Sequence, residues 1–140
     1  MIILDTNVVS AMTRDGPDTP LVRDWLNRQP RSAIWTTSIT VLELRFGVAT
    51  MALGRARSGI ELRTERLLRE YLQGRIAPFD SAAAEATAAL MAERRRAGRT
   101  GELRDSMIAG IAIARHAVLA TRNTRHFADL PVAVVDPWSA

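Results

Sequence analysis

The amino-acid sequence predicts an α/β protein with a mostly parallel sheet. Short apolar segments of strand length alternate along the chain with longer segments that have helical periodicity. The first of these segments, Ile2 to Leu4, is apolar throughout, as expected for a strand that helices cover on both faces. In such sheets the strands run one way and the connecting helices run back.

Five segments have the length and composition of buried strands. They are Ile2 to Leu4, Ala33 to Thr36, Ile76 to Phe79, Val118 to Thr121 and Val132 to Val135. Helices are expected between them because proline, glycine and capping residues mark their starts and ends. These helices cover residues 18 to 29, a segment from about residue 38, residues 60 to 72, 80 to 98 and 103 to 116. Gly54 and Gly59 are expected to separate the second and third helices into a hairpin.

Composition narrows the classes of protein. The 140 residues, 47% of them hydrophobic, suit one domain over residues 1–140. The sequence contains no cysteine, which excludes disulfides, zinc fingers and thiol catalysis. No apolar run approaches the roughly 20 residues of a membrane span, and the first residues lack the features of a signal peptide. We therefore expect a soluble cytoplasmic protein that does not associate with membranes.

The basic residues are compatible with a nucleic-acid partner. All 19 are arginine, and the formal net charge is +4. Arginine binds phosphate oxygens through its planar guanidinium group, although a compositional bias explains so modest a charge as well. The run Arg94 to Arg96 is interpreted as a solvated helix end that complements the helix dipole, with an RNA contact as the alternative. No GxxxxGK[ST] or GxGxxG loop supports a nucleotide-binding fold.

Three carboxylates map to one edge of the predicted sheet. Asp5 ends the first strand, Glu43 lies early in the helix after the second, and Asp105 lies in the first turn of the helix before the fourth. Carboxyl ends of parallel strands and amino ends of their helices share one edge, where ligands bind. Neighbouring carboxylates repel one another, and their oxygens suit Mg²⁺ or Mn²⁺. Asn123 and His126 follow the fourth strand and map to the same edge.

Each of these carboxylates also has a purely structural explanation. Asp5 is suited to capping the next helix. Thr40 to Glu43 matches a capping box, and Asp105 in a first turn is favoured by the helix dipole in any case. These explanations do not predict convergence at the ligand-binding edge. His126 suits either a phosphate contact or a plain surface position.

Four segments carry a resemblance to a known family. They are ILDTN at the start, TTSITVLELRFGV around Glu43, LRDSMIAGIA around Asp105 and LATRNTRHF at 119–127. In this order and spacing they resemble the PIN-domain ribonucleases, especially the FitB-like branch of the VapC-type toxins from bacterial toxin–antitoxin pairs. The ending VVDPW also looks like that branch. The resemblance covers essentially the whole chain, and it rests on four motifs because DTN alone is a weak signal.

This resemblance implies a fold, an activity and partners. The fold is a three-layer PIN-like α/β fold whose parallel sheet has the strand order 3-2-1-4-5. The activity is Mg²⁺-dependent hydrolysis of RNA phosphodiester bonds by the toxin of a type II toxin–antitoxin system. The resemblance further implies a homodimer, and a cognate antitoxin that inhibits the toxin in a hetero-oligomer.

Site residues can be carried over one by one. Asp5, Glu43 and Asp105 match the three core acids of the family. Asp5 and Asp105 are expected to bind the metal most directly, and Glu43 to complete the site as a ligand or by orienting the attacking water. The family's fourth acid usually lies in the segment after the fourth strand, where this sequence has Asn123 and His126 instead. A second metal ion is therefore expected to be held less tightly.

Supporting roles are expected for nearby polar residues. Thr6 and Asn7 are expected to orient Asp5 by hydrogen bonds, and Arg122 or Arg125 to hold the RNA backbone. The helical hairpin between about residues 47 and 74 is a candidate surface for an antitoxin helix, with ordinary core packing as the alternative. Its large apolar residues lie among many arginines: Met51, Leu53, Ile60 and Leu62.

Two other functions are compatible with the sequence. The missing fourth acid is consistent with a PIN-like module that binds RNA or a partner without cleaving. An aspartate after a first strand is also typical of haloacid dehalogenase-like phosphohydrolases, in which Asp5 would be the nucleophile. The presence of Asn7, where those enzymes have a second aspartate, argues against this last possibility.

Overall fold

The computed structural model describes all residues 1–140 and confirms the α/β class. One five-stranded sheet has the order β3-β2-β1-β4-β5, and every pair of neighbouring strands is parallel. The strands are β1 (Ile2–Leu4), β2 (Ile34–Thr37), β3 (Ile76–Ala77), β4 (Val118–Ala120) and β5 (Val134–Val135). This topology matches the order that the resemblance to PIN domains implied.

The central strand β1 delivers Asp5 to the functional edge of the sheet. Ile2 is in register with Ile34 of β2, and Leu4 is in register with Ala120 of β4. The backbone N–H of Asp5 donates to the carbonyl of Ala120 over 2.9 Å, which extends the pairing one residue beyond the strand. Because β1 is fully covered at Leu4, an apolar sequence is required up to the point where the acid begins.

Six α-helices connect and cover the strands. They are α1 (Thr6–Thr13), α2 (Thr19–Asn27), α3 (Ser38–Ala49), α4 (Arg55–Arg66), α5 (Ser81–Arg96) and α6 (Leu103–Ala114). Short helical turns lie at Arg31–Ala33, Leu67–Tyr71 and Thr124–Phe127. Side chains cap three of the helix starts: Asp5 caps α1, Thr37 accepts the N–H of Thr40, and Asp80 accepts the N–H of Ala83, the last two over 3.0 Å. None of the helices combines the length and hydrophobicity needed to span a bilayer.

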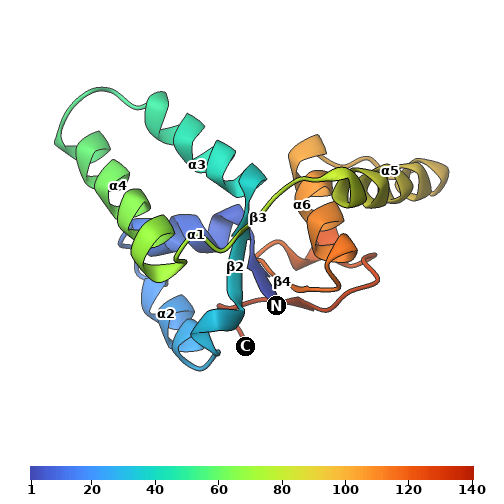
Figure 1. Ribbon diagram of the computed structural model, residues 1–140, viewed down its shortest axis with the longest axis horizontal. Helices are drawn as coiled ribbons and strands as arrows, with labels where there is room; N and C mark the ends of the chain where they lie inside the picture. Colours follow the sequence, from blue (N-terminus) through green and yellow to red (C-terminus); the bar gives the residue numbers. More distant parts are fainter.

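The sheet separates two hydrophobic cores. Figure 1 shows α1, α2 and α4 on one side of the strands and α5 and α6 on the other. On the first side, Val8 and Trp25 pack with Leu72 against the sheet. On the second side, Ile108 and Phe127 belong to a separate cluster. The result is the three-layer arrangement expected for a parallel sheet with helices on both faces.

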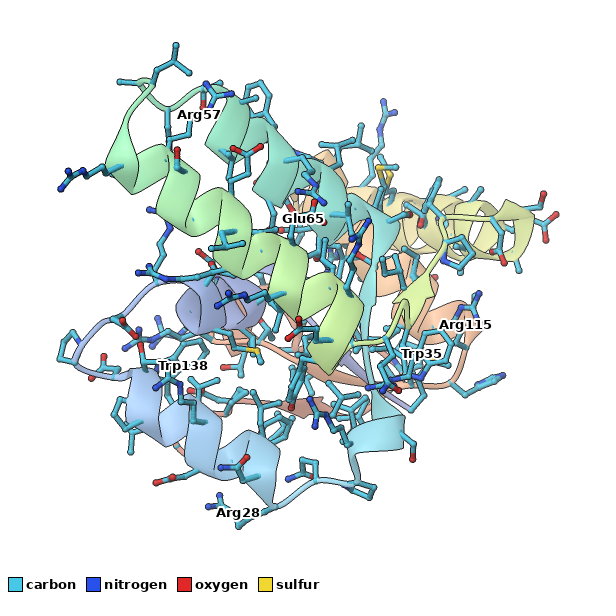
Figure 2. The ribbon with its side chains drawn as sticks, turned by 60° about the vertical axis from the view of Figure 1, so that its left-hand side comes forward. Arg28, Trp35, Arg57, Glu65, Arg115 and Trp138 are labelled. Atoms are coloured by element: carbon cyan, nitrogen blue, oxygen red, sulfur yellow. The ribbon has the colours of Figure 1, made fainter.

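Helices α3 and α4 form a hairpin that extends away from the sheet (Figure 1). Glu65 on α4, labelled in Figure 2, forms an ion pair with Arg45 on α3 and so ties the two helices together. Gly54 begins α4 with a φ of 150°, as the expected break requires. The break predicted at Gly59 is wrong, because α4 starts at Arg55 and runs through Gly59 without distortion.

Further differences concern element lengths. The expected strands at 76–79 and 132–135 pair over two residues each, because residues 78–79 already lead into α5 and residues 132–133 still belong to the bend before β5. The helix expected to end at His116 ends at Ala114, and His116 takes a positive φ of 51°. No bounds were predicted for the helix after Asp5, which here spans eight residues.

Helices α5 and α6 approach each other unusually closely. A Cβ atom added at Gly110 of α6 would lie 1.8 Å from Oγ1 of Thr87 on α5. Only glycine allows this contact, in which the Thr87 hydroxyl donates to the carbonyl of Ala83 over 2.7 Å. Helix α5 therefore depends on α6 for its packing, and α6 carries Asp105 in its first turn.

Candidate active site

Asp5 is both the cap of α1 and the centre of a buried polar network. Its Oδ1 accepts the backbone N–H of Thr6 over 2.7 Å, which caps the helix. Its Oδ2 accepts the hydroxyl of Thr121 over 2.7 Å and the amide of Asn7 over 3.3 Å. The residue is only 3% exposed. The carboxylate of Asp5 therefore caps α1, as its structural explanation requires, and also lies at the predicted site.

The hydroxyl of Thr121 organises the segment that follows β4. It donates to Asp5 and accepts both the amide of Asn7 over 3.2 Å and the backbone N–H of Asn123 over 3.0 Å. Asn7 in turn accepts the N–H of Arg122 over 3.2 Å. The expectation that Asn7 orients Asp5 thus agrees with the geometry. Asn123 is linked to Asp5 indirectly: its backbone N–H donates to the Thr121 hydroxyl, which in turn donates to Asp5. The side chain of Asn123 takes no part in this link.

Burial raises the pKa of Asp5 to about 6. The negative charges of Asp105 and Glu43 raise this pKa further, while the hydrogen bonds from Thr121 and Thr6 lower it. The three carboxylates therefore lie within electrostatic reach of one another, although they are far apart in sequence. This mutual repulsion is the condition that a bound cation relieves.

Glu43 is held at the site by Thr6. The hydroxyl of Thr6 donates to Oε1 of Glu43 over 2.8 Å and lies 3.0 Å from the hydroxyl of Thr40. On the other side, Nη1 of Arg104 lies 4.0 Å from Oε2 of Glu43. The predicted capping box is wrong, because α3 begins at Ser38 and Glu43 falls in its second turn. Thr6 therefore serves both acids, through its N–H and its hydroxyl.

Asp105 lies in the first turn of α6 and is half-buried. Burial raises its pKa, and so does the nearby charge of Glu102, whereas His126 lowers it. Nδ1 of His126 lies 3.7 Å from Oδ2 of Asp105. His126, which lies in the segment after β4, is therefore next to Asp105 and belongs to the candidate site.

The donor set has the chemistry of a site for a hard divalent cation. It consists of carboxylates, and burial raises the pKa of both Asp5 and Asp105, with a smaller contribution from neighbouring carboxylates. The side chains are not already drawn around one point, since no three acidic or histidine residues are placed to hold a single ion. The carboxylates therefore fit Mg²⁺ or Mn²⁺ in their chemistry.

The two arginines expected to hold RNA differ in their surroundings. Nη2 of Arg122 lies 3.2 Å from Asp18, and its guanidinium stacks 4.8 Å from the ring centre of Trp138. Trp138 is labelled in Figure 2 near α1 and α2. Arg125 is exposed and forms no ion pair or side-chain hydrogen bond within the chain. Of the two, Arg125 is the one that is free to contact a ligand.

Arg94 is buried, so its interpretation as part of a solvated helix end is wrong. It is 6% exposed and binds both carboxylate oxygens of Asp129, over 2.9 and 3.0 Å. It also donates to the carbonyl of His126 over 2.8 Å and the hydroxyl of Ser106 over 3.3 Å. The Arg94 guanidinium holds the pKa of Asp129 below its usual range. Sequence reasoning singled out neither Asp129 nor Thr121.

A family model described as the PIN domain matches residues 2–133. The chain belongs to the PIN-domain family. This assignment confirms the resemblance of its four motifs. It also removes the haloacid dehalogenase-like alternative, which requires a different fold family.

Two relatives and one solved structure define its similarity within the family. The chain is 36% identical to VapC ribonuclease Y4jK of Sinorhizobium fredii over 138 residues, covering 99% of this chain and 98% of the relative. It is 35% identical to Toxin FitB of Neisseria gonorrhoeae over 138 residues, covering 99% of each. A structure of FitAB bound to an IR36 DNA fragment superposes with a TM-score of 0.88 at 34% identity, covering 99% of this chain and 96% of that one.

Proposed function

We propose that this PIN domain is a divalent-metal-dependent endoribonuclease, the toxin of a type II toxin–antitoxin pair. The observation that carries the proposal is the buried Asp5 network, with the charges of Glu43 and Asp105 acting on it at the carboxyl edge of a parallel sheet. The names of the relatives, a VapC ribonuclease and a FitB toxin, support the same activity. Mg²⁺ is the proposed cofactor, and Mn²⁺ is expected to substitute for it.

In the proposed mechanism, each residue has one task. Asp5 and Asp105 hold the cation, and Glu43 completes the site or orients the attacking water. A bound Mg²⁺ supplies stabilisation of negative charge on the phosphodiester oxygens and lowers the pKa of that water. Thr121 and Thr6 keep Asp5 and Glu43 in place through their hydroxyl groups.

The test of this function is an RNA-cleavage assay with purified protein. Wild-type protein is expected to cleave RNA with Mg²⁺ and to lose activity with EDTA. Asp5→Ala and Asp105→Ala are expected to be inactive. Ser10→Ala is a matched control, because Ser10 lies on α1 outside the polar network and its hydroxyl forms no hydrogen bond. Full activity in either aspartate variant would rule out the proposed site.

A module that binds RNA without cleaving it is the second candidate. It is favoured by the absence of a fourth acid, since Asn123 and His126 occupy the segment where the family often has one. Calorimetric titration with Mg²⁺ or Mn²⁺ separates the two functions. A ribonuclease is expected to take up the cation at the Asp5 site, whereas a binding module is expected to take up none.

The proposed protein partner is a cognate antitoxin, bound at the α3–α4 hairpin. The FitAB assembly supports a two-component complex for a similar toxin. The hairpin exposes apolar side chains that its own packing does not cover, including Phe46 at 61% and Leu53 at 87%. Leu62 is also exposed, while Met51 and Ile60 are half-buried. Homodimer formation, also implied by the family, is expected in the absence of antitoxin, and light scattering of the purified chain tests it.

A further inference from the structure

A polar cavity adjoins the proposed active site at Asp105. Its volume is about 240 Å³, and none of its eight lining residues is hydrophobic. The walls come from the end of α5, the loop before α6, the first turn of α6 and the turn at Thr124–Phe127. We propose that this cavity binds a phosphate group of the RNA strand next to the bond that is cleaved, through Arg125 and Arg99. This inference rests on the proposed ribonuclease function.

The cavity has a rigid wall because Arg94 is fixed in place. All three nitrogen groups of its guanidinium are engaged: Nε and Nη2 with Asp129, Nη2 also with the carbonyl of His126, and Nη1 with Ser106. These bonds join the end of α5 to α6 and to the segment after β4. Four of the five N–H donors of Arg94 are therefore already used within the chain, and these bonds fix the position of its guanidinium.

Arg125 and Arg99 supply the donors that remain. Arg125 lines the cavity and has no partner within the chain. Arg99 has one distant partner, since its Nη1 lies 3.5 Å from Asp129, a carboxylate already bound by Arg94. A guanidinium without a carboxylate partner is suited to bidentate binding of phosphate oxygens. These two arginines are therefore available for an anion.

The negative charges at the cavity are partly compensated. Glu102 is paired with Arg104 over 3.2 Å, and Asp105 lies beside His126. Arg94, Arg99 and Arg125 line the cavity, and Asp129 pairs with the first two. Arg125 is therefore the guanidinium of the cavity that no carboxylate balances, and it attracts an anion that enters. Because Asp105 belongs both to the cavity and to the proposed metal site, the phosphate bound here would adjoin the reacting one along the strand.

The test measures RNA binding without cleavage. A fluorescent single-stranded RNA is titrated with protein in EDTA, between about 50 and about 200 mM salt. Arg125→Gln is expected to weaken binding about tenfold at the lowest salt and to reduce the slope of log K against log salt by about 0.7, the loss of one phosphate contact. Arg125→Lys keeps the charge and is expected to retain the slope. Arg99→Gln is expected to act in the same direction as Arg125→Gln.

The matched control is Arg28→Gln, which removes the same charge at the end of α2, far from the cavity (Figure 2). It is expected to leave both affinity and slope unchanged. If Arg125→Gln behaves like Arg28→Gln while the wild type binds RNA and cleaves it with Mg²⁺, the subsite is refuted and the ribonuclease proposal stands. If the wild type neither binds nor cleaves RNA, both proposals fail.

Discussion

Replacing Asp5 with asparagine is expected to stabilise the metal-free protein at pH 8 while it abolishes RNA cleavage. Burial raises the pKa of Asp5 from its ordinary value of 3.8 to about 6. The folded protein therefore binds a proton at Asp5 more tightly than the unfolded chain does. The resulting stability is fully present below about pH 4 and is lost as the pH rises through about 6.

The magnitude follows from the pKa and from the hydrogen bonds. The change in pKa of Asp5 from 3.8 to about 6 corresponds to about 3 kcal/mol of unfolding free energy, lost in the wild type at pH 8. Asparagine carries no charge and avoids this loss. It also lacks one acceptor oxygen, so the donors of Thr121 and Asn7 must rearrange, at about 1 kcal/mol for the stronger bond. The expected net gain is about 1–2 kcal/mol.

The assay is urea unfolding in EDTA at pH 4 and pH 8. The free energies of unfolding of the variant and the wild type are compared, with the two proteins expected to have the same m-value. At pH 4, where Asp5 is protonated in the wild type, Asp5→Asn is expected to be no more stable than the wild type. Asp24→Asn, on the exposed face of α2, is the control and is expected to change stability at neither pH. A variant that is destabilised equally at both pH values would refute the reasoning. With Mg²⁺ present, only the wild type is expected to gain stability.

Three further predictions test the packing and the network. Gly110→Ala forces a Cβ atom against α5 and is expected to cost about 1–3 kcal/mol; an unchanged melting temperature would contradict the close approach. Arg94→Met leaves the largely covered carboxylate of Asp129 with only the more distant Arg99 as a partner and is expected to cost about 2–3 kcal/mol in urea unfolding. Adding Asp129→Leu is expected to restore part of this loss, and an equal loss in the double variant would count against the pair. Thr6→Val removes the hydroxyl that holds Glu43 and is expected to lower kcat about tenfold, whereas Thr6→Ser keeps activity; equal rates would exclude this role.

The placement of the acids was predictable because topology decides it. Once short apolar strands alternate with helices, the parallel arrangement brings Asp5, Glu43 and Asp105 to one edge without any knowledge of side-chain positions. The local start of α3 was harder to predict, because Thr37 and Thr40 are both good capping residues. Thr37 caps the helix, with its hydroxyl on the N–H of Thr40, and this places Glu43 one turn further in than a capping box allows.

The partners of the acids depend on tertiary contacts that local patterns do not encode. Nothing near Thr121 in sequence indicates that its hydroxyl meets Asp5, which lies 116 positions away. Arg94 did have a detectable signal. It continues the spacing of Ala83, Thr87 and Leu90, the residues that α5 buries, so helical phase alone places it on the covered face. Because Arg94 is followed by Arg95 and Arg96, the run of three charges suggested a solvated helix end instead.

The hydrogen bond between Asp5 and Thr121 can form only late in the synthesis of the chain. Ribosomes make the chain from its amino end, and contacts between distant residues form only after both have emerged. Strand β1 pairs with β4, and the Asp5 network closes through Thr121. A nascent chain that has not yet released β4 therefore lacks one of the two neighbours of the central strand β1 and the network around Asp5. In the proposed ribonuclease, the site around Asp5 would thus be completed only once that strand is free.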